Sequence, residues 1–93
     1  MRSVTDEQFR AWSHGLQLSD GNSYSELFDA TYDALHRYAM FITRDTDASS
    51  DILQDVYLKL WRVRTTIDPE RSLKALMYQM VRNYALNHER QKK

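Results

Sequence analysis

The sequence predicts an all-α protein, a compact bundle of three long helices preceded by a short N-terminal helix. Two glycines and one proline among 93 residues are too few for a turn-rich β fold. Apolar residues also recur at helical spacing through most of the chain. A chain of this length forms one domain. Within it we expect a short helix and a turn over residues 1–22 and the main helical domain over residues 23–93.

Composition excludes several functional classes. The chain has no cysteine, so it offers neither a disulfide framework nor a thiolate metal site. It has no apolar run near 18 residues and no signal-peptide pattern, which predicts a soluble, cytoplasmic protein without a membrane partner. The three histidines are scattered, and no glycine-rich phosphate loop is present. We therefore expect no metal, no cofactor and no enzymatic activity.

The zero net charge of the chain hides a gradient. Residues 1–55 carry a net charge of −6 and residues 56–93 a net charge of +6. Such an asymmetry suggests an acidic surface for a protein partner and a basic end for nucleic acid. Two halves that simply attract each other on folding would give the same composition.

Capping patterns place the first two helices. Thr5 and Gln8 form a capping pair for a short helix that ends between residues 15 and 18. Ser23, with Glu26 three residues later, is expected to cap the first long helix, which runs to about Thr43. The buried stripe of this helix should contain Leu27, Phe28, Thr31, Leu35, Tyr38, Ala39 and Ile42.

The connection after residue 43 imitates a calcium-binding loop. Its oxygen-bearing residues have the 1, 3, 5, 7 spacing of such a loop: Asp45, Asp47, Ser49 and Asp51. However, Ser50 stands where the loop needs glycine, and Val56 stands where it needs a glutamate. We expect no calcium binding, and we interpret Asp47 as the N-cap of the next helix.

The helix around residues 51–62 carries one leucine on its outer side. Its core face collects Ile52, Leu53, Val56, Tyr57, Leu60 and Val63. Its outer face collects Asp51, Gln54, Asp55 and Arg62, with Leu58 among them and Trp61 at the edge. An apolar side chain ringed by charges predicts a partner-binding face. Isolated surface leucines are nevertheless common, and the pattern alone leaves both interpretations open.

The last helix, about residues 72–90, follows a loop with the only proline. Asp68-Pro69 could start a helical turn in this loop, but Ser72 is an equally good cap for the last helix. Its core stripe should contain Leu73, Leu76, Met77, Met80, Val81 and Tyr84. One exposed line carries Lys74, Tyr78 and Arg82, and a neighbouring line carries Asn83, Asn87 and Arg90. Such residues can neutralise phosphates and stack on bases. A basic helix end favoured by its own dipole is the alternative.

Three segments of the sequence carry specific motifs. The first is Phe28-x-x-x-Tyr32-x-x-Leu35-x-Arg37-Tyr38-Ala39. The second is Ala48-x-x-Asp51-Ile52-Leu53-Gln54-Asp55-Val56-Tyr57-Leu58-Lys59-Leu60-Trp61. The third is Leu76-Met77-Tyr78-x-Met80-Val81-Arg82-Asn83-x-Ala85-Leu86-Asn87. Together these segments resemble region two of a bacterial RNA polymerase sigma factor of the extracytoplasmic-function group. The resemblance extends from about Leu16 to the end of the chain.

The resemblance implies a sigma factor domain that docks on the RNA polymerase core and recognises and melts the minus-ten promoter element. The face that would dock on the clamp coiled coil of the largest polymerase subunit is Asp51, Gln54, Asp55, Leu58, Trp61 and Arg62. The loop that would hold a flipped base of the non-template strand supplies Arg64, Ile67, Asp68, Arg71 and Ser72. The last helix would add Lys74, Tyr78, Arg82, Asn83, Asn87 and Arg90 to the DNA-binding surface. An anti-sigma factor is a further partner that the resemblance implies.

The sequence departs from the family pattern in two places. Leu73 and Leu76 stand where relatives usually carry an aromatic residue, so Tyr78 must supply more of the stacking. The helix-turn-helix domain that reads the upstream promoter element is also absent, and we interpret the chain as a fragment or a natural single-domain form. The rival hypotheses are a helical protein-binding adaptor and a basic DNA-binding protein unrelated to polymerase.

Overall fold

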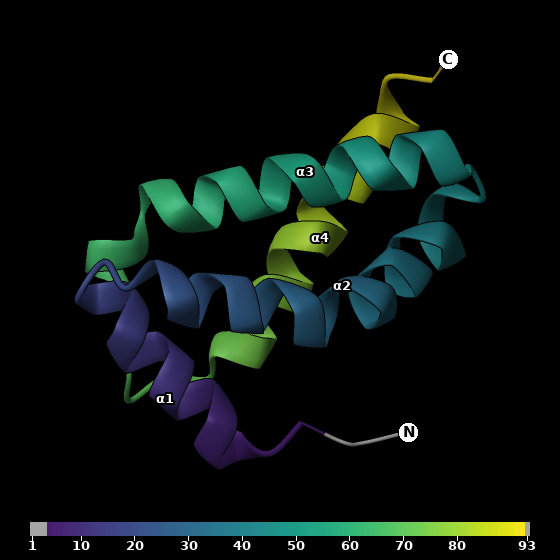
Figure 1. Ribbon diagram of the computed structural model, residues 1–93. Coiled ribbons are helices and arrows are strands. Elements are labelled where there is room, and N and C mark those ends of the chain that lie inside the picture. Colours follow the sequence, from purple (N-terminus) through teal and green to yellow (C-terminus); the bar gives the residue numbers. More distant parts are fainter. Residues whose placement is uncertain (1–3, 93) are drawn as a thin grey trace.

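The computed structural model describes residues 4–92 as four α-helices and one 3₁₀ turn. The helices are α1 (Asp6–Gln17), α2 (Gly21–Thr43), α3 (Thr46–Arg62) and α4 (Leu73–Arg90), and η1 (Arg64–Thr66) follows α3. Helices α2 and α3 lie side by side, α4 crosses behind them, and α1 packs beneath the start of α2 (Figure 1). The predicted all-α bundle is confirmed. Within residues 4–92, no helix combines the length and the apolar character that a membrane crossing needs.

A single core joins all four helices. Its most deeply buried large side chains are Leu16, Leu27, Leu35, Leu53, Val56, Leu60, Met77 and Val81. These residues lie on the predicted apolar faces, because a helix in a bundle must bury one stripe to offset the entropy of ordering the chain. Phe28 was expected in this core but is 37% exposed, since it lies at the edge of the α2–α3 contact and packs on Tyr32 and Tyr57.

Helix α1 packs firmly on the bundle. Phe9, Trp12 and Leu16 are buried, and the Trp12 indole Nε1 donates a hydrogen bond to Glu26 Oε1 over 3.2 Å. Gly15 allows the close approach of α1 to α2, because a Cβ at this position would lie 2.5 Å from Ser23 Cβ. The position of α1 is therefore fixed by a contact that only a glycine permits.

Local capping chemistry set two helix starts as predicted. Thr5 and Gln8 form the reciprocal capping box of α1, and Ser72 Oγ accepts the Ala75 amide at 3.0 Å at the start of α4. Both caps lie immediately before the first helical turn, where a side-chain oxygen can accept an otherwise unpaired backbone amide.

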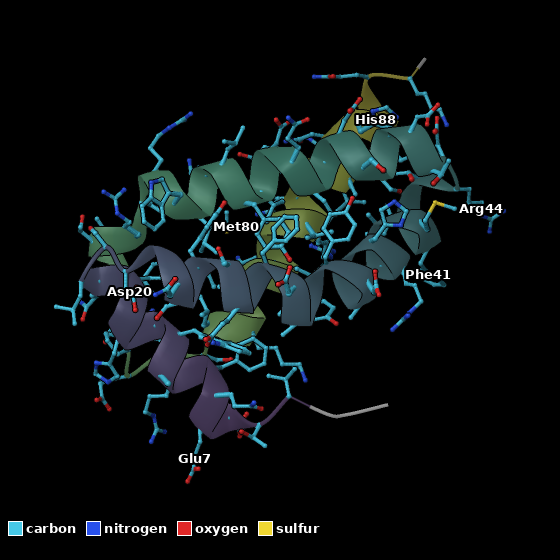
Figure 2. The ribbon with its side chains drawn as sticks, viewed as in Figure 1. Glu7, Asp20, Phe41, Arg44, Met80 and His88 are labelled. Atoms are coloured by element: carbon cyan, nitrogen blue, oxygen red, sulfur yellow. The ribbon has the colours of Figure 1, made fainter. Side chains whose placement is uncertain are left out.

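Two predicted caps were wrong. Asp20, not Ser23, caps α2, because its carboxylate accepts the Asn22 amide at 3.0 Å and the Ser23 hydroxyl at 3.0 Å. Asp20 lies at the turn between α1 and α2 (Figure 2). Asp45, not Asp47, caps α3 by accepting the Ala48 amide at 3.1 Å, and this hydrogen bond lowers the pKa of Asp45. Both helices therefore begin earlier than expected.

A buried hydroxyl network ties α2 to α3. The hydroxyls of Tyr57 and Thr31 are hydrogen-bonded at 2.5 Å, and Thr31 also donates to the Leu27 carbonyl at 2.7 Å. The Tyr24 hydroxyl donates to the Tyr57 carbonyl at 2.8 Å. Burial raises the pKa of Tyr57 to about 12, because it penalises the charged phenolate. The network holds α3 in a fixed rotation, which determines the residues on its outer face.

Candidate functional site

The outer face of α3 presents an apolar centre within a charged rim. Leu58 is 55% exposed, and the surrounding residues Asp51, Gln54, Asp55 and Arg62 are all exposed, as predicted. The two ion pairs found within residues 4–92, Arg71–Asp68 and Lys92–Glu89, involve none of these side chains. The charged groups of this face are thus available to an external partner, and Leu58 would gain by being covered.

The C-terminal end of α3 is stabilised by an aromatic contact and a cation–π contact. Trp61 is half-buried, with its ring centroid 5.0 Å from that of Tyr24. The Arg64 guanidinium lies 4.1 Å above the Trp61 ring, and its Nη1 donates to the Trp61 carbonyl at 2.7 Å. Arg64 Nε also donates to Ser19 Oγ at 2.9 Å. Both residues have structural roles here, and their predicted binding roles remain predictions.

The loop between η1 and α4 borders an open cavity of about 720 Å³. Ile67 is 5% exposed and forms part of its wall from the core side, whereas Asp68, Arg71 and Ser72 are exposed at its edge. The loop is internally braced, because Asp68 Oδ1 accepts the Glu70 amide at 2.9 Å. Four of the five predicted loop residues therefore border one cavity, whereas Arg64 is not among its lining residues.

Helix α4 adds a cationic and amide-bearing surface. Lys74, Arg82, Asn83, Asn87 and Arg90 are exposed. None of the cations among them belongs to either ion pair found within residues 4–92.

Tyr78 departs from its expected exposure. It was placed on an exposed line with Lys74 and Arg82, but it is half-buried, and its ring packs against Tyr38 of α2 at 5.2 Å. The helical periodicity of α4 alone could not predict this contact, because the partner ring belongs to another helix. Tyr78 therefore presents only part of its surface to a ligand.

Several cavity residues were not predicted from the sequence to belong to the functional site. Val63, Thr66 and Gln79 line the 720 Å³ cavity together with the predicted loop residues. Gln79 lies one turn beyond Ala75 on α4, so the helical periodicity of that helix could have indicated it. No cluster of three or more potential metal-ligating histidine or acidic side chains occurs within the described part of the chain.

A protein-family model matches most of the chain, including this loop and α4. The family model described as sigma-70 region 2 matches residues 27–93. The chain belongs to the sigma-70 region 2 family. Comparisons with curated proteins and with solved structures gave no significant match.

Membership of the sigma-70 region 2 family establishes a coarse function. The domain acts in transcription initiation as part of a sigma factor, in promoter recognition with RNA polymerase. Its partners are the polymerase core and promoter DNA, and the family consists of transcription factor domains rather than enzymes. Family membership argues against the rival hypothesis of an adaptor without a DNA function.

Proposed function

We propose that the outer face of α3 docks on the clamp coiled coil of the largest polymerase subunit. The observation that carries this proposal is the exposed Leu58 at the centre of a charged rim that has no ion pair within residues 4–92. Covering Leu58 would remove apolar surface from water, while Asp51, Asp55 and Arg62 could pair with charges on the clamp. We also propose that the protein belongs to the extracytoplasmic-function group and acts in the cytoplasm. An anti-sigma factor would compete with the polymerase for this face.

The same proposal assigns DNA binding to the loop and to α4. The non-template strand of the minus-ten element follows the cationic surface of α4, and a flipped base enters the cavity bounded by Ile67 and Arg71. A melted strand needs cations for its phosphates and a pocket that replaces the lost stacking of an extruded base. The amides of Asn83 and Asn87 are suited to hydrogen bonds with base edges.

Two binding assays test this proposal. The first measures the affinity of the 93-residue chain for a fragment that contains the polymerase clamp helices. The second measures, at two salt concentrations, its affinity for a fluorescein-labelled single strand of about 12 nucleotides, selected by the protein from a random pool. We expect saturable binding in both assays and a steep salt dependence in the second. Binding of duplex DNA without any clamp binding would overturn the polymerase assignment.

A further inference from the structure

Helix α1 lies outside the matched residues 27–93, yet it forms one wall of a second cavity at the start of α4. This cavity has a volume of about 250 Å³ and lies between α1 and the segment of residues 69–74. Arg10 and Ser13 line it from α1, and Ser72 and Lys74 line it from the other side. The cavity is thus built partly from residues that the family match does not include.

An unpartnered hydroxyl lines this cavity. Ser13 is 1% exposed, and its Oγ has no hydrogen-bond partner within residues 4–92. A buried hydroxyl without a partner costs free energy, so native proteins rarely retain one without a reason. An incoming acceptor in the cavity would satisfy the Ser13 hydroxyl.

The start of α4 supplies a favourable field for such an acceptor. The helix has 18 residues, and its first turn contains no acidic side chain. Ser72 Oγ accepts the Ala75 amide, while Leu73 and Lys74, the first two helical residues, line the cavity. The amides at a helix N-terminus and the helix dipole favour an anion.

The charges around the cavity identify the kind of anion. Arg10, Arg71 and Lys74 contribute three positive charges, and Asp6 and Glu70 two negative charges, so the lining carries a net charge of +1. A net positive lining favours an anion, and the adjoining cavity proposed for the flipped base favours a phosphodiester of the same strand as its source. The two cavities lie next to each other, because both this one and the 720 Å³ cavity are bordered by Arg71, Ser72 and Leu73.

We infer that the cavity between α1 and the start of α4 binds a backbone phosphate of the non-template strand, next to the flipped base. The hydroxyl of Ser13 donates to the phosphate, and Arg10 and Lys74 neutralise it. The inference rests on the proposed function, because the strand must first reach the loop. It assigns to α1 a direct contact with DNA.

The test compares Ser13→Ala and Arg10→Gln with the matched controls Ser25→Ala and Lys59→Gln, whose residues are exposed and lie outside the cavity lining. We expect Ser13→Ala to weaken binding of the selected strand about fivefold. Arg10→Gln should weaken it similarly and lower the salt slope by about 0.7. The controls should change neither quantity. Thermal unfolding should show Ser13→Ala at least as stable as wild type, since the lost hydroxyl had no partner.

A methylphosphonate scan of the strand locates the contact. Phosphates of the strand are replaced one at a time with a neutral methylphosphonate. At a single position the loss of affinity should be smaller for Ser13→Ala and for Arg10→Gln than for wild type, because each variant has already lost one contact with that phosphate. If Ser13→Ala and Arg10→Gln bound the strand as tightly as wild type while Lys74→Ala and Arg82→Ala bound it more weakly, the phosphate site would be overturned and the proposed function would stand. Inorganic phosphate can also be titrated while the NMR shifts of the Leu73 and Lys74 amides are followed. If phosphate shifted these resonances to saturation and the strand did not compete with it, the phosphate site would also be overturned. A wild-type chain that binds no strand would overturn the proposed function as well.

Discussion

The outer face of α3 and the first turn of α4 differ in shape, and each suits a different kind of partner. The α3 face is convex and regular, with one exposed leucine inside a charged rim. The first turn of α4 is hollowed, because cavities of about 510, 250 and 720 Å³ all include its residues Leu73 or Lys74 in their lining. A protein partner can be bound largely through one apolar side chain that it covers, whereas a flexible nucleic-acid strand needs several cavities and cations along its path. The two surfaces should therefore respond to different substitutions.

Leu58→Asp should have the largest effect. It places a charge at the centre of the proposed clamp interface, and we expect clamp affinity to fall by roughly 30-fold or more. Stability should change little, because Leu58 is 55% exposed. Titration of the clamp fragment by calorimetry measures the change. Leu18→Asp is the matched control, since Leu18 is 82% exposed at the end of α1 and should leave clamp affinity unaltered.

Lys74→Ala combined with Arg82→Ala should weaken strand binding about tenfold and lower the salt slope by about 1.4, because two phosphate contacts are lost. Fluorescence anisotropy at several salt concentrations measures both quantities. The control removes the same charge from α3 by Lys59→Ala and Arg62→Ala. If the control pair weakened strand binding equally, the loss would reflect only the lower net charge of the protein, and α4 would not be the DNA-binding surface.

The sequence predicted the α3 face better than the first turn of α4. The rotation of α3 follows from its periodicity, because Leu53, Val56 and Leu60 must all be buried and Leu58 must then point outward. The cavities at α4 could not be derived in this way. They depend on the loop geometry and on the approach of α1, which Gly15 permits.

The same distinction explains the errors in the predicted caps. Asp20 and Ser23 are both good capping residues, and so are Asp45 and Asp47, so spacing alone could not choose within either pair. At α3, the choice depends on a buried contact, since Thr43 Oγ1 bonds both Ser49 Oγ at 3.0 Å and the Asp45 amide at 3.2 Å. Likewise, the partial burial of Tyr78 depends on Tyr38 of another helix.

Gly15→Ala should disturb the α4 end and spare the α3 face. The new methyl group would collide with the side chain of Ser23, so α1 must shift away from α2. We expect a net loss of about 1–2 kcal/mol of stability, because overpacking outweighs the better helix propensity of alanine. Chemical denaturation measures the loss. Strand affinity should also fall while clamp affinity stays constant, and equal losses in both assays would show that α1 supports the whole bundle.

Tyr57→Phe should have the smallest effect, a loss of about 1 kcal/mol from the missing hydrogen bond to Thr31. The pKa of Tyr57 in the folded protein, about 12, lies above its ordinary value of 10.0. Its contribution is therefore fully present below pH 10 and is lost as the pH rises toward 12. Unfolding free energies measured across this range should fall less steeply for Tyr57→Phe than for wild type. Parallel pH profiles would contradict the assigned burial of the hydroxyl.

The most direct test of two separable surfaces is a crossed measurement on two proteins. Leu58→Asp and the Lys74→Ala, Arg82→Ala double variant are each titrated with both the clamp fragment and the selected single strand. We predict that Leu58→Asp loses clamp binding and keeps wild-type strand affinity, while the double variant shows the reverse pattern. If both proteins lost both activities, or if Leu58→Asp bound the clamp fragment as tightly as wild type, the assignment of α3 to polymerase and α4 to DNA would be contradicted.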